Sequence, residues 1–456
     1  MTRVAVVGAG IAGLGAAYAL QEAGLEVIVL EKAAVPGGRM QTRSEQGYTW
    51  EAGAQFLLDD QYVHMKRLLR KLGIPLSAHR IPSVTAIVLP DGRLWYIRMG
   101  RPLDLLRHPA LRPASRWRLG KVFLAAWRHR RHLHFHHPEL AAGLDTESVR
   151  QWGDREVGPD AVDFLLSVPF STFFFWRPEE TSLWCLLGIA GLQGAWKVVV
   201  PEGGLGAVTA ALARRLDVRL QTTVERVEIG PDGRVTLRIA DRGGAAELVV
   251  DRVILATSAP VTLALLADPD RALGRVRADF VRSIRYVSNL TTAVGYRRAP
   301  ETRAYGISIP IALGHPVAAI EWTHTKGPDR APAGHGLAVV MPTHAWSVAN
   351  ARHPDEAVAA DLVAAVDSLY PGNAAEADFH RVVRWEHAIP VAEPGWASRL
   401  AAALAAGPAP GSPVFACGDY WAGPSTEWAL MSGWQAAAEL LQSLGRSIPP
   451  EYAVAM

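Results

Sequence analysis

Short apolar runs near the N-terminus alternate with a segment of small residues. Val4–Val7 and Val27–Leu30 are runs of the kind found in buried parallel strands. Between them, IAGLGAAYALQEAG predicts a helix with a glycine and alanine face that stops near Gly24. This strand–helix–strand order predicts an α/β fold whose first unit is Rossmann-like.

Related patterns return later in the chain. Residues 201–228 predict a glycine turn, an amphipathic helix and a strand, and 251–260 contain a further apolar strand. Residues 289–298 and 336–342 favour strands of an antiparallel sheet. A short strand and a helix that begins near Thr426 close the chain.

Composition excludes several classes of protein. The 456 residues are 49% hydrophobic and 20% charged, enough for roughly two or three domains with buried cores. A net charge of +3 gives no reason to expect a nucleic-acid partner. Cys185 and Cys417 form neither a disulfide framework nor a metal quartet. With no signal peptide and no long apolar run recognised, we expect a cytoplasmic location.

The first strand runs directly into a nucleotide fingerprint. Gly8, Gly10 and Gly13 form G-x-G-x-x-G, which permits a tight turn, a close pyrophosphate and a helix pressed on its strand. Glu31 ends the second strand, where a carboxylate suits the hydroxyls of an adenosine ribose. A 2′-phosphate would be repelled there, so NADP is disfavoured.

A second glycine pair follows the acid. In PGGRMQT (36–42), Gly37 and Gly38 let the chain pass close to a bound group, and Arg39 suits a phosphate or a flavin. Residues 51–57 then read EAGAQFL. This ordered set resembles the flavin amine oxidase superfamily, which includes monoamine and polyamine oxidases, protoporphyrinogen oxidases and phytoene and squalene desaturases. The resemblance implies FAD as the cofactor.

The resemblance continues to the end of the chain. Residues 201–228 look like the segment that returns to the FAD domain, and 383–395 look like the stretch that brings Trp385 near the flavin. Residues 415–437 are similar to the family's closing motif. Cys417 does not match the covalent flavin site of some amine oxidases, so the resemblance implies non-covalent FAD.

Taken residue by residue, the resemblance implies a complete cofactor site. Asp419 would lie near the ribityl chain or pyrophosphate, and free amides at 426–428 would face the O2 edge of the flavin, where they favour negative charge. The residues implied to bind FAD are Gly8, Gly10, Ile11, Ala12, Gly13, Glu31, Lys32, Gly37, Gly38, Arg39, Gly53, Ala54, Gln55, Phe56, Val224, Ala256, Trp385, Gly418, Asp419, Thr426, Glu427, Trp428 and Ala429.

The resemblance also implies a discontinuous domain layout. A glutathione-reductase-like FAD-binding domain would use residues 1–78, 195–282 and 384–456. An α+β substrate-binding domain would use 79–194 and 283–383.

Two departures from the amine oxidases bear on the substrate. Residues 286–296 contain no lysine where those enzymes usually place one near flavin N5, and Ser425 stands where many have a cage aromatic. Residues 157–183 and the run around Arg330 resemble protoporphyrinogen oxidases instead. The pattern is closest to the protoporphyrinogen oxidase and desaturase branch.

The predicted activity rests on FAD, because no side chain stands out as a general base. We expect dehydrogenation of a C–C or C–N bond in a largely apolar small molecule by hydride transfer to flavin N5, with O2 or another electron acceptor. Asn289, Trp385 and Ser425 are the catalytic candidates, as pocket residues that face the flavin. An amine or amino-acid oxidase with a nonstandard cage, and a flavin-dependent isomerase without net redox, remain open alternatives.

Residues 98–137 carry nine arginines, one lysine and one aspartate, a net charge of +9 by count. Apolar residues that include Trp117 and Trp127 are interleaved with them. Such a segment suits either a helical lid or peripheral contact with an anionic membrane. His132, His134 and His136 alternate at strand spacing, but we expect a solvated basic segment and no metal site.

Aromatic residues are dense in FSTFFFW (170–176). Consecutive rings cannot share one face of a strand, so we expect some in the core. The others would form an apolar wall for the substrate.

Overall fold

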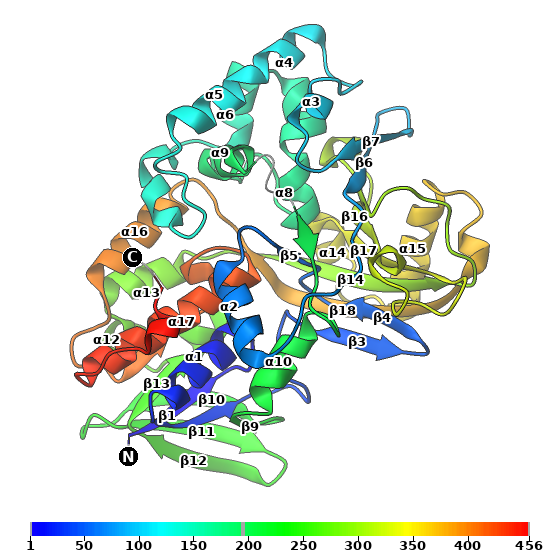
Figure 1. Ribbon diagram of the computed structural model, residues 1–456. Coiled ribbons are helices and arrows are strands. Elements are labelled where there is room, and N and C mark those ends of the chain that lie inside the picture. The colour runs from blue at the N-terminus through cyan, green and yellow to red at the C-terminus, as the bar shows by residue number, and fades with distance from the viewer. Residues whose placement is uncertain (1, 193–196, 455–456) are drawn as a thin grey trace.

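The computed structural model describes residues 2–192 and 197–454. Two bodies, each built on a sheet, lie side by side under a group of helices (Figure 1). The predicted boundary between 194 and 195 lies outside the described residues.

A five-stranded parallel sheet forms the first body, in the order β19-β13-β1-β2-β9. Its strands come from distant parts of the sequence: β1 (Arg3–Val7), β2 (Glu26–Leu30), β9 (Asp217–Arg219), β13 (Arg252–Leu255) and β19 (Val414–Ala416). The inward residues of β1 and β2 are fully or almost fully buried, as apolar parallel strands require. The predicted N-terminal strand–helix–strand unit and the mixed α/β fold with a parallel sheet are confirmed.

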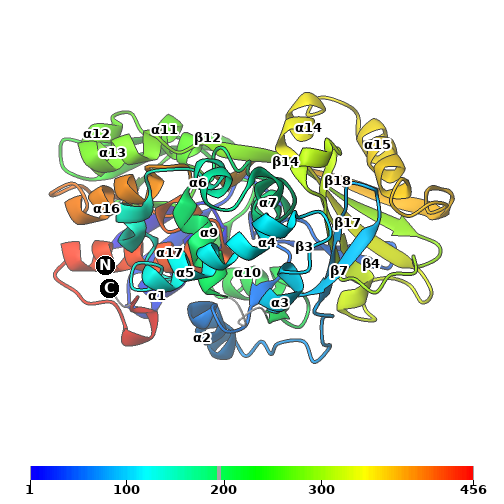
Figure 2. The ribbon, with the colours of Figure 1, turned by 90° about the horizontal axis from the view of Figure 1, so that it is seen from above.

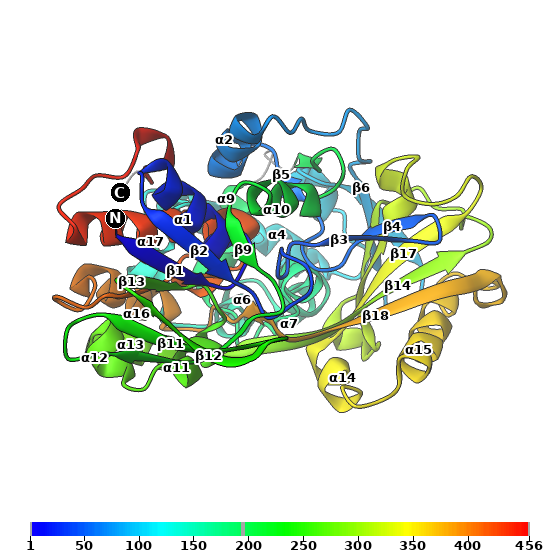
Figure 3. The same ribbon diagram turned by 90° about the horizontal axis from the view of Figure 1, so that it is seen from below.

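Helices cover this sheet. The elements are α1 (Ile11–Glu22), α2 (Val63–Leu72), α10 (Gly206–Ala213), α11 (Ala259–Leu265), α12 (Pro269–Leu273), α13 (Arg275–Arg282), α16 (Trp396–Ala406) and α17 (Thr426–Ser443). Figure 3 shows α1 and α17 next to each other, although more than 400 residues separate them. The predicted start of the last helix at Thr426 is confirmed.

Three antiparallel strands flank the first body: β10 (Thr223–Ile229), β11 (Val235–Asp241) and β12 (Gly244–Val250). Two short antiparallel pairs are separate from both large sheets: β5 (Leu57–Leu58) with β8 (Val198–Val199), and β3 (Thr42–Glu45) with β4 (Tyr48–Glu51), whose Tyr48 and Trp50 pack against strands of the second body.

The second body is a seven-stranded, mostly antiparallel sheet in the order β18-β14-β17-β16-β15-β6-β7. Its strands are β6 (Val84–Val88), β7 (Leu94–Arg98), β14 (Tyr286–Tyr296), β15 (Gly306–Ser308), β16 (Val317–Trp322), β17 (Gly336–Pro342) and β18 (Ala377–Pro390). The strands predicted at 289–298 and 336–342 are β14 and β17, which pair antiparallel. Helices α14 (His344–Ala349) and α15 (Asp355–Asp367) lie beside the long β14–β18 pair (Figure 2).

Residues between β7 and β8 are mainly helical. The elements are α3 (Pro102–Leu105), α4 (Pro113–Arg118), α5 (Gly120–Arg128), α6 (Val149–Glu156), α7 (Pro159–Ala161), α8 (Val168–Phe173) and α9 (Leu183–Gly191). The strand spacing read from His132, His134 and His136 is wrong. These residues lie in turns after α5, and His134 forms an isolated bridge with His137. The three histidines are therefore not in a strand, and their spacing does not place them on one face.

No helix in the described part of the chain combines the length and apolarity that crossing a bilayer requires.

Candidate cofactor and substrate site

One large cavity, of about 960 Å³, lies where the carboxyl ends of β1, β2 and β13 face the second sheet and the helices above it. Ligands of parallel α/β sheets bind at this edge. The cavity is lined by all of the residues predicted to bind FAD except Gly13 and Glu427, and by all three catalytic candidates. Its size is at the upper end of the roughly 300–1,000 Å³ typical of small-molecule sites.

The fingerprint glycines leave room for a group at the backbone. A Cβ on Gly13 would lie 2.1 Å from the Gly8 carbonyl oxygen, so this residue lets α1 press on the loop from outside the cavity. A Cβ on Gly10 would meet no atom within 4 Å, because this position faces open space at the cavity wall. The backbone N–H of Gly37 donates a hydrogen bond to the Ala9 carbonyl oxygen at 2.8 Å. This bond joins the second glycine loop to the first. These features fit a bound pyrophosphate.

The Glu31 carboxylate is buried at the end of β2. Its two oxygens accept hydrogen bonds from the backbone N–H groups of Ala9, at 2.7 Å, and Ala33, at 2.9 Å. Each oxygen keeps acceptor capacity on the cavity side, because a carboxylate accepts about four hydrogen bonds. This arrangement fits the ribose hydroxyls expected there.

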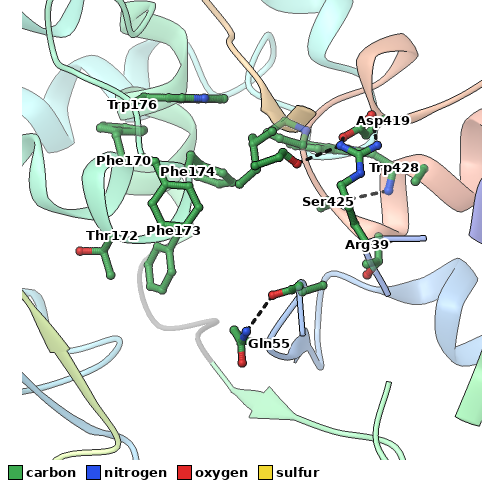
Figure 4. A pocket seen from close by; sticks show the side chains of 18 of the residues that line it. Arg39, Gln55, Phe170, Thr172, Phe173, Phe174, Trp176, Asp419, Ser425 and Trp428 are labelled. Carbon is green, nitrogen blue, oxygen red and sulfur yellow. Dashed lines mark hydrogen bonds and ion pairs between the residues drawn. The ribbon is translucent and has the colours of Figure 1, made fainter. Parts of the chain in front are cut away.

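Arg39 and Asp419 form a bidentate ion pair across the cavity wall (Figure 4). The two N–O distances are 2.6 and 3.0 Å, and Arg39 also donates to the Ala388 carbonyl at 2.9 Å. Burial works to lower the pKa of Arg39, but the charge of Asp419 and the neighbouring Tyr286 raise it above its ordinary value. The guanidinium therefore stays charged, and its Cζ lies over the Tyr286 ring, 5.9 Å from the ring centroid.

Helix α17 begins at the cavity. Ser425 is its N-cap residue, and the Ser425 hydroxyl accepts a hydrogen bond from the Trp428 N–H at 3.2 Å. The expectation that the amides of 426–428 are all free is therefore wrong for Trp428, because the cap satisfies that donor. A Cβ on Gly433 would lie 2.1 Å from the Ala12 carbonyl oxygen, which shows how closely α17 approaches α1.

Glu427 points away from this wall. Its carboxylate is fully buried and accepts hydrogen bonds from the backbone N–H groups of His64 and Met65, both at 2.8 Å. The side chain therefore caps the start of α2, and any contact of Glu427 with a cofactor would come from its backbone.

The three catalytic candidates already have hydrogen-bond partners. The Asn289 amide donates to the Pro342 carbonyl at 2.7 Å and accepts from the Thr291 hydroxyl at 2.8 Å. The Trp385 indole N–H donates to the Ala52 carbonyl at 2.8 Å. These bonds orient the side chains, and none of them presents a strong base to the cavity.

An aromatic wall faces the cofactor side. Figure 4 shows Phe170, Phe174 and Trp176 on the opposite side of the pocket from Arg39 and Asp419. Phe174 stacks on Trp176 with ring centroids 4.7 Å apart, and Phe170 and Trp176 are nearly parallel at 6.5 Å.

Phe173 reaches from this wall to the cofactor side, where it meets Phe56 edge to face at 5.8 Å. The segment is not a strand, because 168–173 form helix α8.

Sequence reasoning missed several polar lining residues. Glu321 is buried in β16, where its carboxylate accepts from the Tyr305 hydroxyl at 2.7 Å and pairs with Lys326 at 2.6 Å. The Thr172 hydroxyl and the Gln55 side-chain oxygen are buried at the wall without a hydrogen-bond partner among the described residues. No motif marks Glu321, because it stands alone in an apolar strand.

Comparisons with known proteins agree with this geometry. The family model for "Flavin containing amine oxidoreductase" matches residues 11–441. Mitochondrial protoporphyrinogen oxidase of Nicotiana tabacum is 29% identical over 177 residues, 37% of this chain and 31% of that protein. Carotenoid phi-ring synthase of Streptomyces griseus is 30% identical over 266 residues, 52% of this chain and 50% of that protein. The matched region thus spans half or less of these curated relatives.

Among solved structures, a putative protoporphyrinogen oxidase from Exiguobacterium sp. has the same fold. It superposes with a TM-score of 0.76 at 19% identity, over 98% of this chain and 99% of the other. The match over nearly the whole chain, together with the glycine loops that open into one cavity, shows that this chain belongs to the flavin-containing amine oxidoreductases and that FAD is its cofactor.

Proposed function

We propose that the protein dehydrogenates a C–C or C–N bond of a largely apolar small molecule, with FAD as the hydride acceptor. The observation that carries this proposal is the aromatic wall of Phe170, Phe173, Phe174 and Trp176 opposite the cofactor side of one continuous cavity. Such a wall favours a flat or lipidic substrate, because aromatic rings offer apolar area and no competing charge.

Charged side chains such as Glu321 and Arg384 line the cavity, but no lysine of the described lining lies on β14. Lys32 is the only lysine among the described residues that line the cavity, and it follows Glu31 at the ribose end. Lys326 does not line it, and its ammonium group is held by Glu321 and by the Gln55 carbonyl at 2.8 Å. The part of the cavity that faces β14 therefore presents amide and hydroxyl groups, supplied by Asn289 and Thr291.

The chain's own residues would then position the substrate and exclude water. Bound FAD supplies the hydride acceptor, and O2 or a second acceptor restores it. The aromatic wall, formed by α8 and the residues that follow it, holds the apolar body of the substrate. The N-terminus of α17 favours negative charge beside the cofactor.

We infer that FAD is bound without a covalent link. Cys417 is fully buried and does not line the cavity, and burial raises the pKa of its thiol. Cys185 lines the cavity, but burial raises its pKa well above the ordinary value, so it remains a thiol. Neither residue is poised for attack as a thiolate.

The proposed division into a glutathione-reductase-like FAD domain and an α+β substrate domain has support in the fold. The first would include the parallel sheet and β10–β12, and the second the seven-stranded sheet. Strand β18 runs unbroken through residue 384, so one proposed boundary falls inside a strand. The two domains would share that strand.

We also propose that α4 and α5 contact an anionic membrane surface, from which an apolar substrate would enter. Trp117, Leu124 and Trp127 are 88%, 59% and 62% exposed, a concentration of large apolar side chains that needs a partner. The side chains of Arg118 and Arg128 beside them form no ion pair or hydrogen bond within the described chain. The neighbouring Val122 and Phe123 line the cavity.

Anaerobic flavin bleaching tests the activity. The purified holoprotein is mixed with amines, amino acids, polyenes and porphyrinogens, and absorbance of the oxidised flavin is followed. Bleaching by an apolar polyene or porphyrinogen supports the proposal. Bleaching by polar amines or amino acids alone would overturn the apolar substrate class and indicate an amine or amino-acid oxidase. Turnover with no net reduction of the flavin would indicate an isomerase.

A further inference from the structure

Three polar side chains from distant parts of the chain meet just behind the N-terminus of α17. They are His64 in the first turn of α2, His136 in the turns after α5, and Glu427 in the first turn of α17. One ligand atom from each lies within 4.8 Å of the others. The cluster is separate from the cavity, since none of the three lines it.

The carboxylate of Glu427 lacks an ordinary counter-ion. Its side chain is 0% exposed, and the described ion pairs join it only to His64 and His136. Within the described chain, its oxygens accept hydrogen bonds only from these two histidines and from the backbone at the start of α2. An ionised carboxylate buried without lysine or arginine leaves a charge that a bound cation would balance.

We propose that His64, His136 and Glu427 bind a divalent transition-metal ion of the zinc class. Two imidazole nitrogens and one carboxylate are a common ligand set for this ion. Glu427 Oε1 lies 2.8 Å from His64 Nδ1 and 3.3 Å from His136 Nε2. Ligand atoms about 2.0–2.2 Å from one metal ion have separations of about 3–3.5 Å at right or tetrahedral angles. The third pair, His64 Nδ1 and His136 Nε2, lies within 4.8 Å, so the ion would draw the two imidazoles together.

The two histidines can adopt the protonation states that this binding requires. The two imidazole nitrogens that face Glu427 must give up their hydrogens, and a neutral imidazole can carry its hydrogen on the other ring nitrogen. His136 Nε2 also lies 3.0 Å from the Gln61 carbonyl oxygen, which is placed to be a fourth ligand. The His136 side chain is 15% exposed and provides a route for the ion.

The metal ion would link two segments of the chain beside the cofactor. It would tie the segment after α5, which forms part of the cavity wall through Phe135, to α17, whose first turn lines the same cavity. A hydrogen bond already links these parts, because the Trp428 indole N–H donates to the Phe135 carbonyl at 2.6 Å. The ion would therefore stabilise the closed wall without taking part in the redox chemistry.

Metal content and cobalt absorption test the site on tag-free holoprotein. After chelator treatment and dialysis against Zn²⁺, we expect about one zinc per chain, and Co²⁺ in its place should give visible ligand-field bands beyond the flavin absorption. His136→Asn should weaken binding at least tenfold and abolish the zinc-dependent rise in melting temperature. His132→Asn, an exposed histidine of the same segment outside the cluster, is the matched control and should bind like the unaltered protein.

Three outcomes would overturn the proposal. They are no retained zinc in the unaltered protein, equal binding by the His136→Asn variant, and an equal loss in the His132→Asn variant, which would assign the metal to the surface histidines. Because none of these readouts uses turnover, they are independent of the proposed reaction.

Discussion

Asp419 binds Arg39 through both carboxylate oxygens, although 380 positions separate the two residues in sequence. The pair joins the loop after β2 to the loop after β19, and both loops line the cofactor cavity. The Asp419 side chain is 10% exposed and the Arg39 side chain 33% exposed, so the pair is partly shielded from water. Each residue fixes the other where the cofactor would lie.

Asp419→Asn should weaken FAD binding. The substitution keeps the shape but removes the charge that holds Arg39, and hydrogen bonds to charged groups contribute about 1.5–3 kcal/mol, roughly a 10- to 100-fold change in Kd. Titration of apoprotein by quenching of FAD fluorescence measures this. Arg381→Gln, which breaks an exposed arginine–glutamate pair with Glu45, is the control and should leave Kd unchanged. Equal affinities in both variants would refute a role for the pair.

Gly433→Ala should destabilise the protein and reduce its FAD content. The added methyl group would lie 2.1 Å from the Ala12 carbonyl oxygen, so α17 must move away from α1. Overpacking of this kind costs about 1–3 kcal/mol, and the backbone contact leaves no flexible side chain to yield. Scanning fluorimetry and the ratio of flavin to protein absorbance measure both effects.

Gly120→Ala is the matched control for Gly433→Ala. It is an exposed helical glycine with nothing within 4 Å of an added Cβ. Alanine is favoured over glycine in helices by about 1 kcal/mol, so this variant should be as stable as the unaltered protein or slightly more. A similar loss of stability in both variants would mean that the α1–α17 contact is not the cause.

The motifs that sequence reasoning located are local, and the contacts that it missed are not. Gly8, Gly10 and Glu31 could be placed because strand, turn and acid follow one another within a single unit. The aromatic wall is predicted from FSTFFFW (170–176), but which rings face the cavity is not, since a helix and a strand place consecutive rings differently. Glu427 is predicted to meet the cofactor through its backbone amide, and no sequence signal shows that its side chain binds the start of α2.

Long-range pairs carry no sequence signal of their own. Glu321 reads as one acid in an apolar strand, and only the fold brings Tyr305 and Lys326 to it. His136 was considered with its neighbours in sequence, but its carboxylate partner lies 291 positions away. One sequence without related sequences offers no means of finding such pairs.

Trp117→Ser combined with Trp127→Ser should reduce binding to anionic vesicles at least tenfold. Burying an exposed aromatic side chain contributes roughly 1.5–3 kcal/mol, and the surrounding arginines add an attraction that salt screens. Co-sedimentation with vesicles containing phosphatidylglycerol measures the effect, and neutral phosphatidylcholine vesicles should bind weakly. Val348→Ser, a 54% exposed residue on α14, is the control. If neither vesicle binds the unaltered protein, the exposed face is not a membrane contact.

Lowering the pH should destabilise the segment around His108 before the rest of the protein. His108 is fully buried between α3 and α4, next to Trp95 at a centroid distance of 4.5 Å. Its Nδ1 accepts a hydrogen bond from the Ala110 N–H at 3.2 Å, which requires the neutral ring. Burial, together with the charge of Arg116, lowers the pKa of His108 from 6.5 to about 4.

The sign of the effect follows from proton uptake. Between the two pKa values the unfolded segment binds a proton that the folded segment does not, so stability is complete above pH 6.5 and falls as the pH drops toward 4. The loss of stability reaches about 3 kcal/mol once the pH is below the folded-state pKa of His108. Hydrogen exchange of peptides covering 94–111 should show this decline. His108→Asn, which keeps an acceptor for Ala110 but does not titrate, should remove it; an unchanged acid response in that variant would assign the loosening to other groups.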